Sequence, residues 1–193
     1  MRFFKKLVGK KCYLSPVDTS AEAIEKYTQW LNDSEISIPL NNFTKVINND
    51  KEKEFLNELL TKTPYTFAIV DIGNDNLIGN CGLFAVDNIH QTAEVGLFIG
   101  DKSCWNKGYG TEALSLLIDY GFNALNLHNI QLRVFSFNKR GIRSYEKIGF
   151  KEYGRRREDV FIAGKRHDTI FMDILASEFK SIYINDKFNE YYG

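Results

Sequence analysis

The segment 92–123 constrains the fold more than any other part of this chain. Residues 93–99 (Ala-Glu-Val-Gly-Leu-Phe-Ile) read as a strand, and residues 105–113 (Trp-Asn-Lys-Gly-Tyr-Gly-Thr-Glu-Ala) place two glycines around a tyrosine. Apolar residues then recur at helical spacing, namely Ala113, Leu114, Leu117, Ile118 and Phe122. This order suits an anionic phosphate, because glycines let the backbone approach a ligand and first-turn N–H groups have no helical partner. The same pattern also suits a tight turn before a core helix.

Length and composition narrow the class of protein. We expect one domain over residues 1–193. No apolar run approaches the roughly 20 residues that span a bilayer, and the basic start is not followed by a cleavable apolar segment, so neither a membrane anchor nor a signal peptide is predicted. Cys12, Cys81 and Cys104 are an odd number and lack metal-ligand spacing. These features predict a cytoplasmic protein without a disulfide framework.

Hydrophobic periodicity and turn formers predict the elements of the fold. Helices are expected near Ala21–Leu31 (capped by Thr19 or Ser20), near Lys51–Leu60 (capped by Asn49 or Asp50), through the segment ending at Asn123, and over Lys139–Ile148. Strands are expected near Lys11–Ser15, Thr66–Val70, Leu77–Phe84, Thr92–Ile99, Asn129–Ser136, Phe150–Phe161 and His167–Leu175, the last two flanking a turn at Ala163-Gly164. The tail, Ser177–Gly193, is not assigned.

This order of elements predicts an α/β fold with one central mixed, mostly antiparallel sheet flanked by helices. The successive antiparallel strands exclude a doubly wound parallel sheet. The glycine loop lacks the Gly-Lys-Ser/Thr of a P-loop and the third glycine of the dinucleotide-binding spacing, so both nucleotide-binding interpretations fail.

A second motif follows the glycine loop, at residues 138–150: Asn-Lys-Arg-Gly-Ile-Arg-Ser-Tyr-Glu-Lys-Ile-Gly-Phe. Together the two motifs resemble the GNAT superfamily of acetyl-CoA-dependent N-acetyltransferases, most closely the branch with ribosomal-protein N-terminal and spermidine acetyltransferases. Further similarities lie at Trp30–Asp33, at Ala93–Gly96, and at Arg157–Phe161 with Gly164 and Asp168. The resemblance covers about residues 10–176. It departs at Trp105, where the family often has Gln or Arg, so a polar contact from that position is lost.

The resemblance implies a GNAT-like single domain that moves an acetyl group directly from acetyl-CoA to a primary amine, without a metal. It implies that the loop binds the pyrophosphate through Lys107, Gly108, Tyr109, Gly110 and Thr111. It further implies that Asn138 and the backbone of Phe98 and Ile99 contact the pantetheine arm, the backbone as an added strand would. For Lys107 and Asn138 the alternatives are a solvated lysine and a turn residue.

The chemistry of acetyl transfer suggests two catalytic residues. Tyr145 stands seven residues after Asn138, as the family's catalytic tyrosine does, and a phenol with a pKa of about 10 stays protonated to act as the acid. The alternative for Tyr145 is a positioning role alone. Glu94 is the candidate base, directly or through water, and the alternative is an exposed or ion-paired strand residue. For Glu112, the helix dipole is a sufficient explanation.

The acceptor class stays open between a protein N-terminus, a polyamine, an aminoglycoside and an amino sugar. Residues 19–62 carry eight acidic side chains against five lysines, which favours a cationic amine. Asp33 and Glu35 are the candidate substrate-binding residues, because they are expected in the loop after the first helix. Glu52, Glu54 and Glu58 are expected on the outer face of an amphipathic helix.

Other partners are not expected. The net charge is zero and the run 155–157 (Arg-Arg-Arg) is typical of a solvated or ion-paired face, so no nucleic acid is predicted. The three histidines lack metal-ligand spacing. The oligomeric state is open, a homodimer being one alternative, and so is a second function: a catalytically inactive acyl-CoA-binding or partner-binding module of the same fold.

Overall fold

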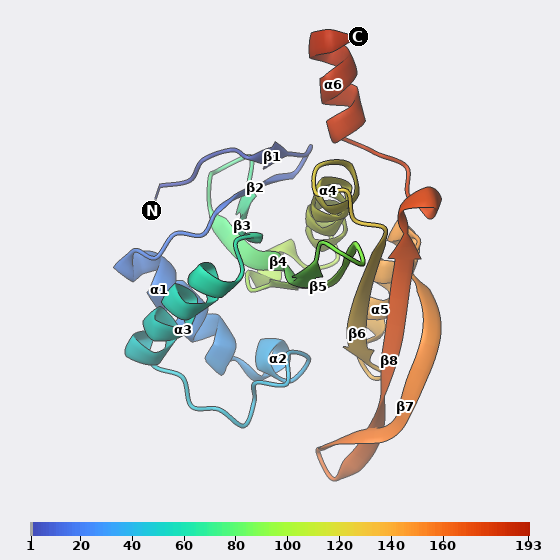
Figure 1. Cartoon of the computed structure of the whole chain (residues 1–193). Helices are drawn as coiled ribbons and strands as arrows, with labels where there is room; N and C mark the ends of the chain where they lie inside the picture. Colours follow the sequence, from blue (N-terminus) through green and yellow to red (C-terminus); the bar gives the residue numbers. More distant parts are fainter. Residues whose placement is uncertain (1) are drawn as a thin grey trace. The chain divides into compact units, whose positions relative to one another are not determined.

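The computed structural model describes residues 2–193, which form two compact units. The first unit comprises the chain up to Phe84 together with Gly96–Leu117, and the second comprises Ala85–Val95 and Ile118–Gly193. Strands β4 (Leu77–Asp87) and β5 (Thr92–Ile99) and helix α4 (Tyr109–Asn123), which Figure 1 labels, each contribute residues to both units by their residue numbers.

The other strands are β1 (Leu7–Val8), β2 (Cys12–Pro16), β3 (Thr66–Asp71), β6 (Asn129–Phe135), β7 (Lys151–Ile162) and β8 (Lys165–Leu175). The eight strands follow the order β1-β2-β3-β4-β5-β6-β8-β7 in one sheet. Strands β5 and β6 pair in parallel, with Thr92 opposite Asn129, whereas the pairs β1/β2, β2/β3, β3/β4, β6/β8 and β7/β8 are antiparallel. The predicted α/β fold with a mixed, mainly antiparallel sheet is confirmed.

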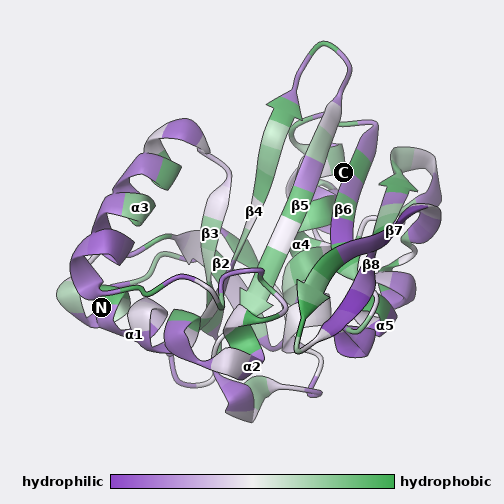
Figure 2. Cartoon of the chain, turned by 90° about the horizontal axis from the view of Figure 1, so that it is seen from below, coloured by the Kyte–Doolittle hydropathy of each residue, from purple (hydrophilic) through white to green (hydrophobic). Residues whose placement is uncertain are grey.

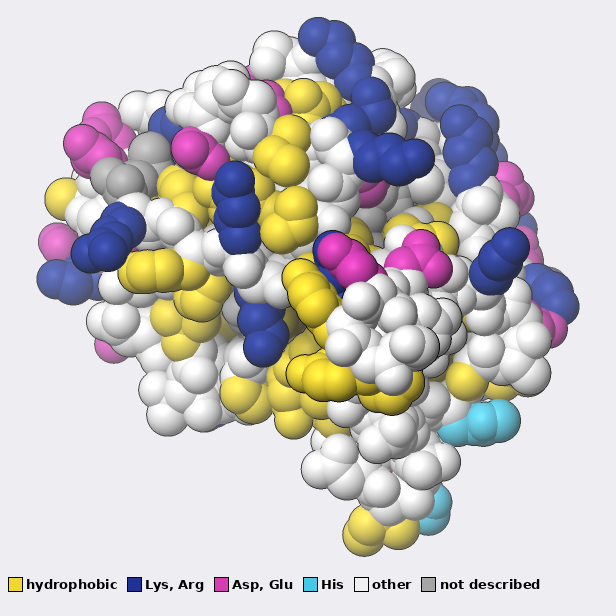
Figure 3. Space-filling model, turned by 90° about the horizontal axis from the view of Figure 1, so that it is seen from above, with side chains coloured by type: hydrophobic (Ala, Val, Ile, Leu, Met, Phe, Trp, Pro, Cys, Tyr) yellow, Lys and Arg dark blue, Asp and Glu magenta, His cyan; other side chains and the backbone are white. Residues whose placement is uncertain are grey.

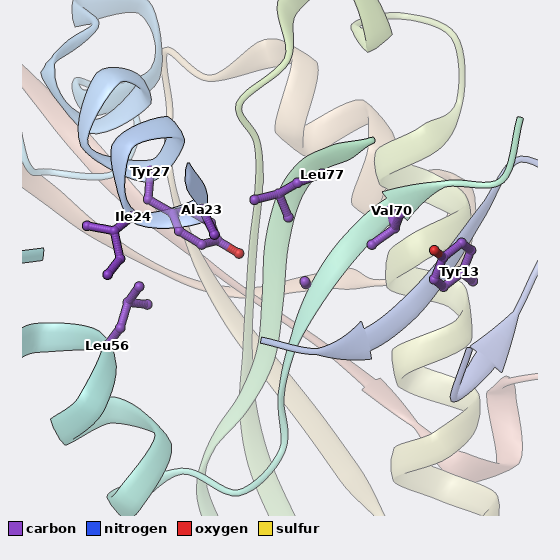
Figure 4. Packing of buried hydrophobic residues seen from close by; sticks show 8 residues of the cluster. Tyr13, Ala23, Ile24, Tyr27, Leu56, Val70 and Leu77 are labelled. Atoms are coloured by element: carbon purple, nitrogen blue, oxygen red, sulfur yellow. The ribbon is translucent and has the colours of Figure 1, made fainter. Parts of the chain in front are cut away.

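In the first unit, helices α1 (Ala21–Asn32) and α3 (Asn49–Lys62) cover a shared core. Helix α1 begins after Ser20, one of the two predicted caps, whose Oγ accepts a hydrogen bond from the Ala23 N–H at 3.4 Å. Its buried residues fall at helical spacing: Ala23, Ile24, Tyr27 and Leu31. Figure 4 shows Ile24 and Leu56 pointing toward each other from the two helices, with Tyr27 beside them.

Helix α3 differs from the prediction in two ways. It begins at Asn49 rather than Lys51, because the Asn48 side chain accepts a hydrogen bond from the Lys51 N–H at 3.0 Å and caps an earlier turn. Polar and apolar residues alternate along it, as in an amphipathic helix (Figure 2). However, the expectation that Glu52 lies on its outer face is wrong: Glu52 is buried, with 3% of its surface exposed.

The segment after α1 also corrects the prediction. Asp33 does not lie in a loop but caps a short helix, α2 (Ser34–Ser37), whose first turn contains Glu35. The Asp33 Oδ1 accepts a hydrogen bond from the Glu35 N–H at 2.9 Å. This helix was not predicted, because a single turn is too short to show a helical periodicity of apolar residues.

The second unit contains helix α5 (Lys139–Ile148) and the strands β6, β8 and β7. Helix α5 ends at Gly149, whose φ of 114° is a conformation that favours glycine and closes the helix with hydrogen bonds to Tyr145 and Glu146 carbonyls. The β7–β8 hairpin, orange and red in Figure 1, turns at Ala163-Gly164 as predicted.

The tail that the sequence left unassigned forms helix α6 (Ile184–Tyr192) in the second unit. Its start is fixed by the fully buried carboxylate of Asp119. This carboxylate accepts hydrogen bonds from the Ser181 hydroxyl at 2.8 Å and from the N–H groups of Ile182, Tyr183 and Ile184 at 2.7–3.1 Å. Within residues 2–193, none of the helices has the length and apolar character to cross a membrane.

Candidate functional site

The glycine loop lies between β5 and α4. The chain leaves β5 at Ile99, forms a short 3₁₀ turn at Lys102–Cys104 and enters α4 at Tyr109. Gly108 has a φ of 88°, which a residue with a Cβ rarely adopts, so glycine is required there by the backbone. At Gly110, by contrast, a Cβ would make ordinary contacts with Ile99 and Leu97 at 3.5–3.6 Å. Gly110 is therefore not required by the protein's own packing.

Side chains hold the loop in place from within the first unit. Trp105 donates its indole N–H to the Ile99 carbonyl at 2.8 Å. The Tyr109 hydroxyl donates to Asp71 Oδ2 at 3.2 Å, and the Lys11 ammonium lies 5.9 Å above the Tyr109 ring. Trp105 thus anchors the loop, at the position where the family often carries a polar residue.

Glu112 in the first turn of α4 has a structural role that the dipole argument did not foresee. Its Oε1 accepts hydrogen bonds from the backbone N–H groups of Lys11 at 2.7 Å and Cys12 at 3.2 Å. These donors belong to the β1–β2 hairpin. Glu112 therefore ties the start of α4, and with it the glycine loop, to that hairpin.

The two candidate substrate-binding residues share one cation. The Lys102 ammonium lies 2.6 Å from Asp33 Oδ2 and also binds Glu35. The hydrogen bond from Lys102 holds the pKa of Asp33 below its ordinary value. A cavity of about 400 Å³ opens beside this triad. Its lining residues are Lys26, Gln29, Trp30, Asp33, Leu77, Gly100, Asp101 and Lys102.

In the second unit, Glu94 is paired with a cation. It lies opposite Gln131 in the parallel β5–β6 ladder. Its Oε1 accepts a hydrogen bond from the Arg133 Nε at 2.9 Å and lies 2.9 Å from an Nη of the same guanidinium. The pair is partly exposed: 28% of the Glu94 side chain and 61% of the Arg133 side chain. Ion pairing was one of the alternatives for Glu94, and this arrangement is present.

Tyr145 and Asn138 both lie at α5. The Asn138 Oδ1 accepts a hydrogen bond from the Gly141 N–H at 3.0 Å and so caps the helix. Tyr145 stands two turns later with its ring 6.1 Å from Phe150, edge to face. Burial raises the pKa of Tyr145 to about 12. In the described part of the chain no group hydrogen-bonds to its hydroxyl, so this donor is available.

Two of the three arginines in the basic run on β7 are ion-paired, in line with the predicted solvated or ion-paired face. Arg155 binds Glu152 and Asp168, and Arg156 binds Asp159. Figure 3 shows basic side chains interspersed with acidic ones on the face that it draws. Across residues 2–193, no three His, Cys, Asp or Glu side chains are grouped to hold a metal ion.

The structure thus places the predicted residues in two sets. The loop, Phe98, Ile99, Asp33 and Glu35 belong to the first unit, and Glu94, Asn138 and Tyr145 belong to the second. The sequence did not predict that Lys102 pairs with Asp33 and Glu35, or that Arg133 pairs with Glu94. It also did not predict that Glu52 is buried. Only Glu52 carried a usable signal, since it lies four residues before the core residue Leu56 and shares its helix face.

Comparisons with known proteins agree with this geometry. Residues 12–151 match the family described as "Acetyltransferase (GNAT) domain". The chain is 32% identical to the spermidine N(1)-acetyltransferase of Vibrio cholerae over 67% of this chain and 75% of that one. It is 30% identical to the N-acetyltransferase p20 of Bacillus licheniformis over 78% of this chain and 86% of that one.

Solved structures give the same result. The spermidine N-acetyltransferase from Vibrio cholerae in complex with CoA and spermine matches with a TM-score of 0.77 and 27% identity, over 88% of this chain and 98% of that one. A GNAT-family acetyltransferase from Bacillus anthracis matches with a TM-score of 0.76 at 22% identity, over 89% of this chain and 99% of that one, and supports the fold alone.

Proposed function

Since the chain belongs to the GNAT acetyltransferases and is an N-acetyltransferase of that family, we propose that it transfers the acetyl group of acetyl-CoA to a primary amine of a cationic, polyamine-like acceptor. The main support for acetyl-CoA as the acetyl donor is the glycine loop at the start of α4. A relative from the same family was solved in complex with CoA. The acceptor class is supported by the spermidine acetyltransferases among the relatives.

The donor binds through the backbone of the loop. The first-turn N–H groups of α4 have no helical partner and suit the pyrophosphate oxygens, which the helix dipole also favours. Gly110, which the protein's packing does not require, leaves room for the phosphates to approach. Lys107 adds a positive charge, and the Phe98 and Ile99 backbone pairs with the pantetheine arm, which Asn138 also contacts.

The reaction is a direct transfer. The neutral amine attacks the thioester carbonyl carbon, a C–N bond forms, and the C–S bond then breaks. The Tyr145 hydroxyl gives its proton to the leaving thiolate, because a phenol that has no hydrogen-bond partner among residues 2–193 and stays protonated at neutral pH is a suitable donor. Glu94, directly or through water, takes the proton that the amine loses.

Asp33 and Glu35 complete the proposal as an acidic wall that attracts the acceptor, with Lys102 neutralising part of their charge. The test is a thiol-release assay with acetyl-CoA and a panel of amines: spermidine, a peptide N-terminus, an aminoglycoside and glucosamine. Mass spectrometry identifies the products. We expect acetylation of the polyamine. Thiol release with glucosamine alone would contradict the proposed acceptor class. No thiol release with any amine would contradict the proposed acetyltransferase activity.

A further inference from the structure

Lys11 lies beside the glycine loop although it is far from the loop in sequence. It ends the turn between β1 and β2, and a Cβ placed at Gly108 would lie 3.7 Å from the Lys11 Cε. Its ammonium lies 5.9 Å from the centre of the Tyr109 ring. All three residues belong to the first unit. The aliphatic part of Lys11 therefore lies along the loop, and its charge lies beside the side chain of the first residue of α4.

Glu112 fixes the backbone of Lys11 in this place. Its Oε1 accepts hydrogen bonds from the N–H groups of Lys11 at 2.7 Å and Cys12 at 3.2 Å. The turn leaves room for this carboxylate because Gly9 has no side chain: a Cβ there would lie 2.2 Å from the same oxygen. The Gly9 N–H also donates to the Cys12 carbonyl at 2.9 Å and closes the turn. These contacts hold the start of β2 against the first turn of α4.

The charge of Lys11 has no anionic partner in the part of the chain that the structure describes. None of the ion pairs among residues 2–193 includes Lys11. The two neighbouring carboxylates are engaged elsewhere, since Glu112 binds backbone N–H groups and Asp71 accepts the Tyr109 hydroxyl. The N-terminus of a helix carries a partial positive charge of its own. One anion at the loop would therefore stabilise both the helix end and the exposed Lys11.

We propose that Lys11 binds a phosphate group of CoA, so that the β1–β2 hairpin contributes to the donor site. This inference rests on the proposed function, which has the pyrophosphate at the glycine loop. An ammonium offers phosphate oxygens a full positive charge and three hydrogen-bond donors, which the loop N–H groups supply only as partial charges. CoA carries a pyrophosphate and a 3′-phosphate, and the same chemistry recognises either group. Lys11 thereby favours a phosphorylated acyl carrier over a neutral one.

The test compares Lys11→Met with Lys10→Met, a matched change at the preceding lysine, which is also exposed. Calorimetry measures Kd for CoA and for 3′-dephospho-CoA. Lys11→Met should raise Kd for CoA at least about fivefold, whereas Lys10→Met and the charge-preserving Lys11→Arg should stay within about twofold. With dephospho-CoA the loss persists if Lys11 binds the pyrophosphate and disappears if it binds the 3′-phosphate. Added salt, from about 20 to about 300 mM NaCl, should reduce the loss, because the contact is an exposed charge pair.

A second measurement uses the wild-type protein. Reductive methylation followed by peptide mass spectrometry reports how accessible each lysine ammonium is, and saturating CoA should reduce the methylation of Lys11 but not of Lys10.

Four results would overturn the role of Lys11 and leave the loop assignment intact. They are an unchanged Kd for CoA in Lys11→Met, equal losses in the two methionine variants, a loss that salt does not reduce, and methylation of Lys11 that CoA does not change. Failure of the wild type to bind CoA would instead overturn the proposed donor, and the inference with it.

Discussion

The Glu94 carboxylate and the Arg133 guanidinium lie 2.9 Å apart on the neighbouring strands β5 and β6. One oxygen of Glu94 accepts a hydrogen bond from the Arg133 Nε and also lies 2.9 Å from an Nη, so the contact is both an ion pair and a charge-assisted hydrogen bond. This arrangement sharpens the question of how Glu94 acts. A carboxylate paired with an arginine can stabilise the sheet through the ion pair. Alternatively, the arginine can position the carboxylate so that it accepts a proton.

Paired variants separate these two roles. If Glu94 accepts the proton of the amine, Glu94→Gln should lower kcat by about 10²-fold or more, because general base catalysis typically contributes that much. Arg133→Met keeps the carboxylate and should leave kcat within about threefold. Thiol-release kinetics at saturating amine give the comparison. If kcat were equal in both variants and the wild type, Glu94 would not be the general base. Its role would be the ion pair with Arg133, a partly exposed contact that contributes less than about 1 kcal/mol to stability.

Tyr145→Phe should lower kcat by about 10²–10⁴-fold and leave the affinity for acetyl-CoA nearly unchanged, because only the proton donor is removed. The half-buried ring and its contact with Phe150 remain, so the variant should fold normally. Turnover and calorimetric binding are measured on the same preparation. A decrease in kcat well below tenfold would reduce Tyr145 to a positioning role.

The raised pKa of Tyr145 also predicts a pH profile. Because burial moves this pKa to about 12, the hydroxyl stays protonated through neutral and moderately alkaline solution. We therefore expect kcat at saturating substrates to show no decline assignable to Tyr145 between pH 7 and about 10. A falling limb near pH 9 that disappears in Tyr145→Phe would show that its pKa is not raised.

Gly110→Glu should weaken acetyl-CoA binding by at least tenfold, since the side chain adds a negative charge where we propose the pyrophosphate binds. The new Cβ itself fits, at 3.5 Å from Ile99. Gly110→Gln is the control: it adds the same bulk without the charge and should weaken binding less. The affinity for acetyl-CoA is measured by calorimetry. An unchanged affinity in the folded Gly110→Glu variant would contradict the proposal that the loop binds the pyrophosphate.

The sequence predicted what short-range signals encode. The glycine loop, the cap of α1, the bounds of α5 and the β7–β8 turn depend on a few neighbouring residues, and all were found close to their predicted positions. The partners of the site residues were not predictable in this way. Lys102 lies far along the chain from Asp33 and Glu35, and only the tertiary fold brings them together. Glu52 was predicted on the exposed face of α3 because charged side chains are usually exposed, whereas the structure buries it.

Glu52 should give the protein a pH-dependent stability. Its folded-state pKa of about 7 exceeds the ordinary value of 4.5, so the folded state holds a proton that the unfolded state releases between these values. The free energy of unfolding should therefore fall as the pH rises from about 4.5 to about 7, by about 3 kcal/mol at most, and level off above. Urea denaturation at several pH values should show this component in the wild type and not in Glu52→Gln. Parallel curves for the two proteins would contradict it.

The ion-paired triad of Asp33, Glu35 and Lys102 leads to two opposite predictions for KM. Removing its acidic side chains should raise KM for spermidine, and removing its lysine should lower it. The double variant Asp33→Asn with Glu35→Gln removes the acidic wall and should raise KM for spermidine at low salt. Lys102→Met frees both carboxylates from their shared cation and should lower the same KM. Because the groups are partly exposed, added salt should screen them, raising KM of the wild type and reducing the differences between variants. The measurement is KM for spermidine at 20 and 300 mM NaCl. If both variants move KM in the same direction, the triad acts by holding α2 in place and not by attracting the acceptor.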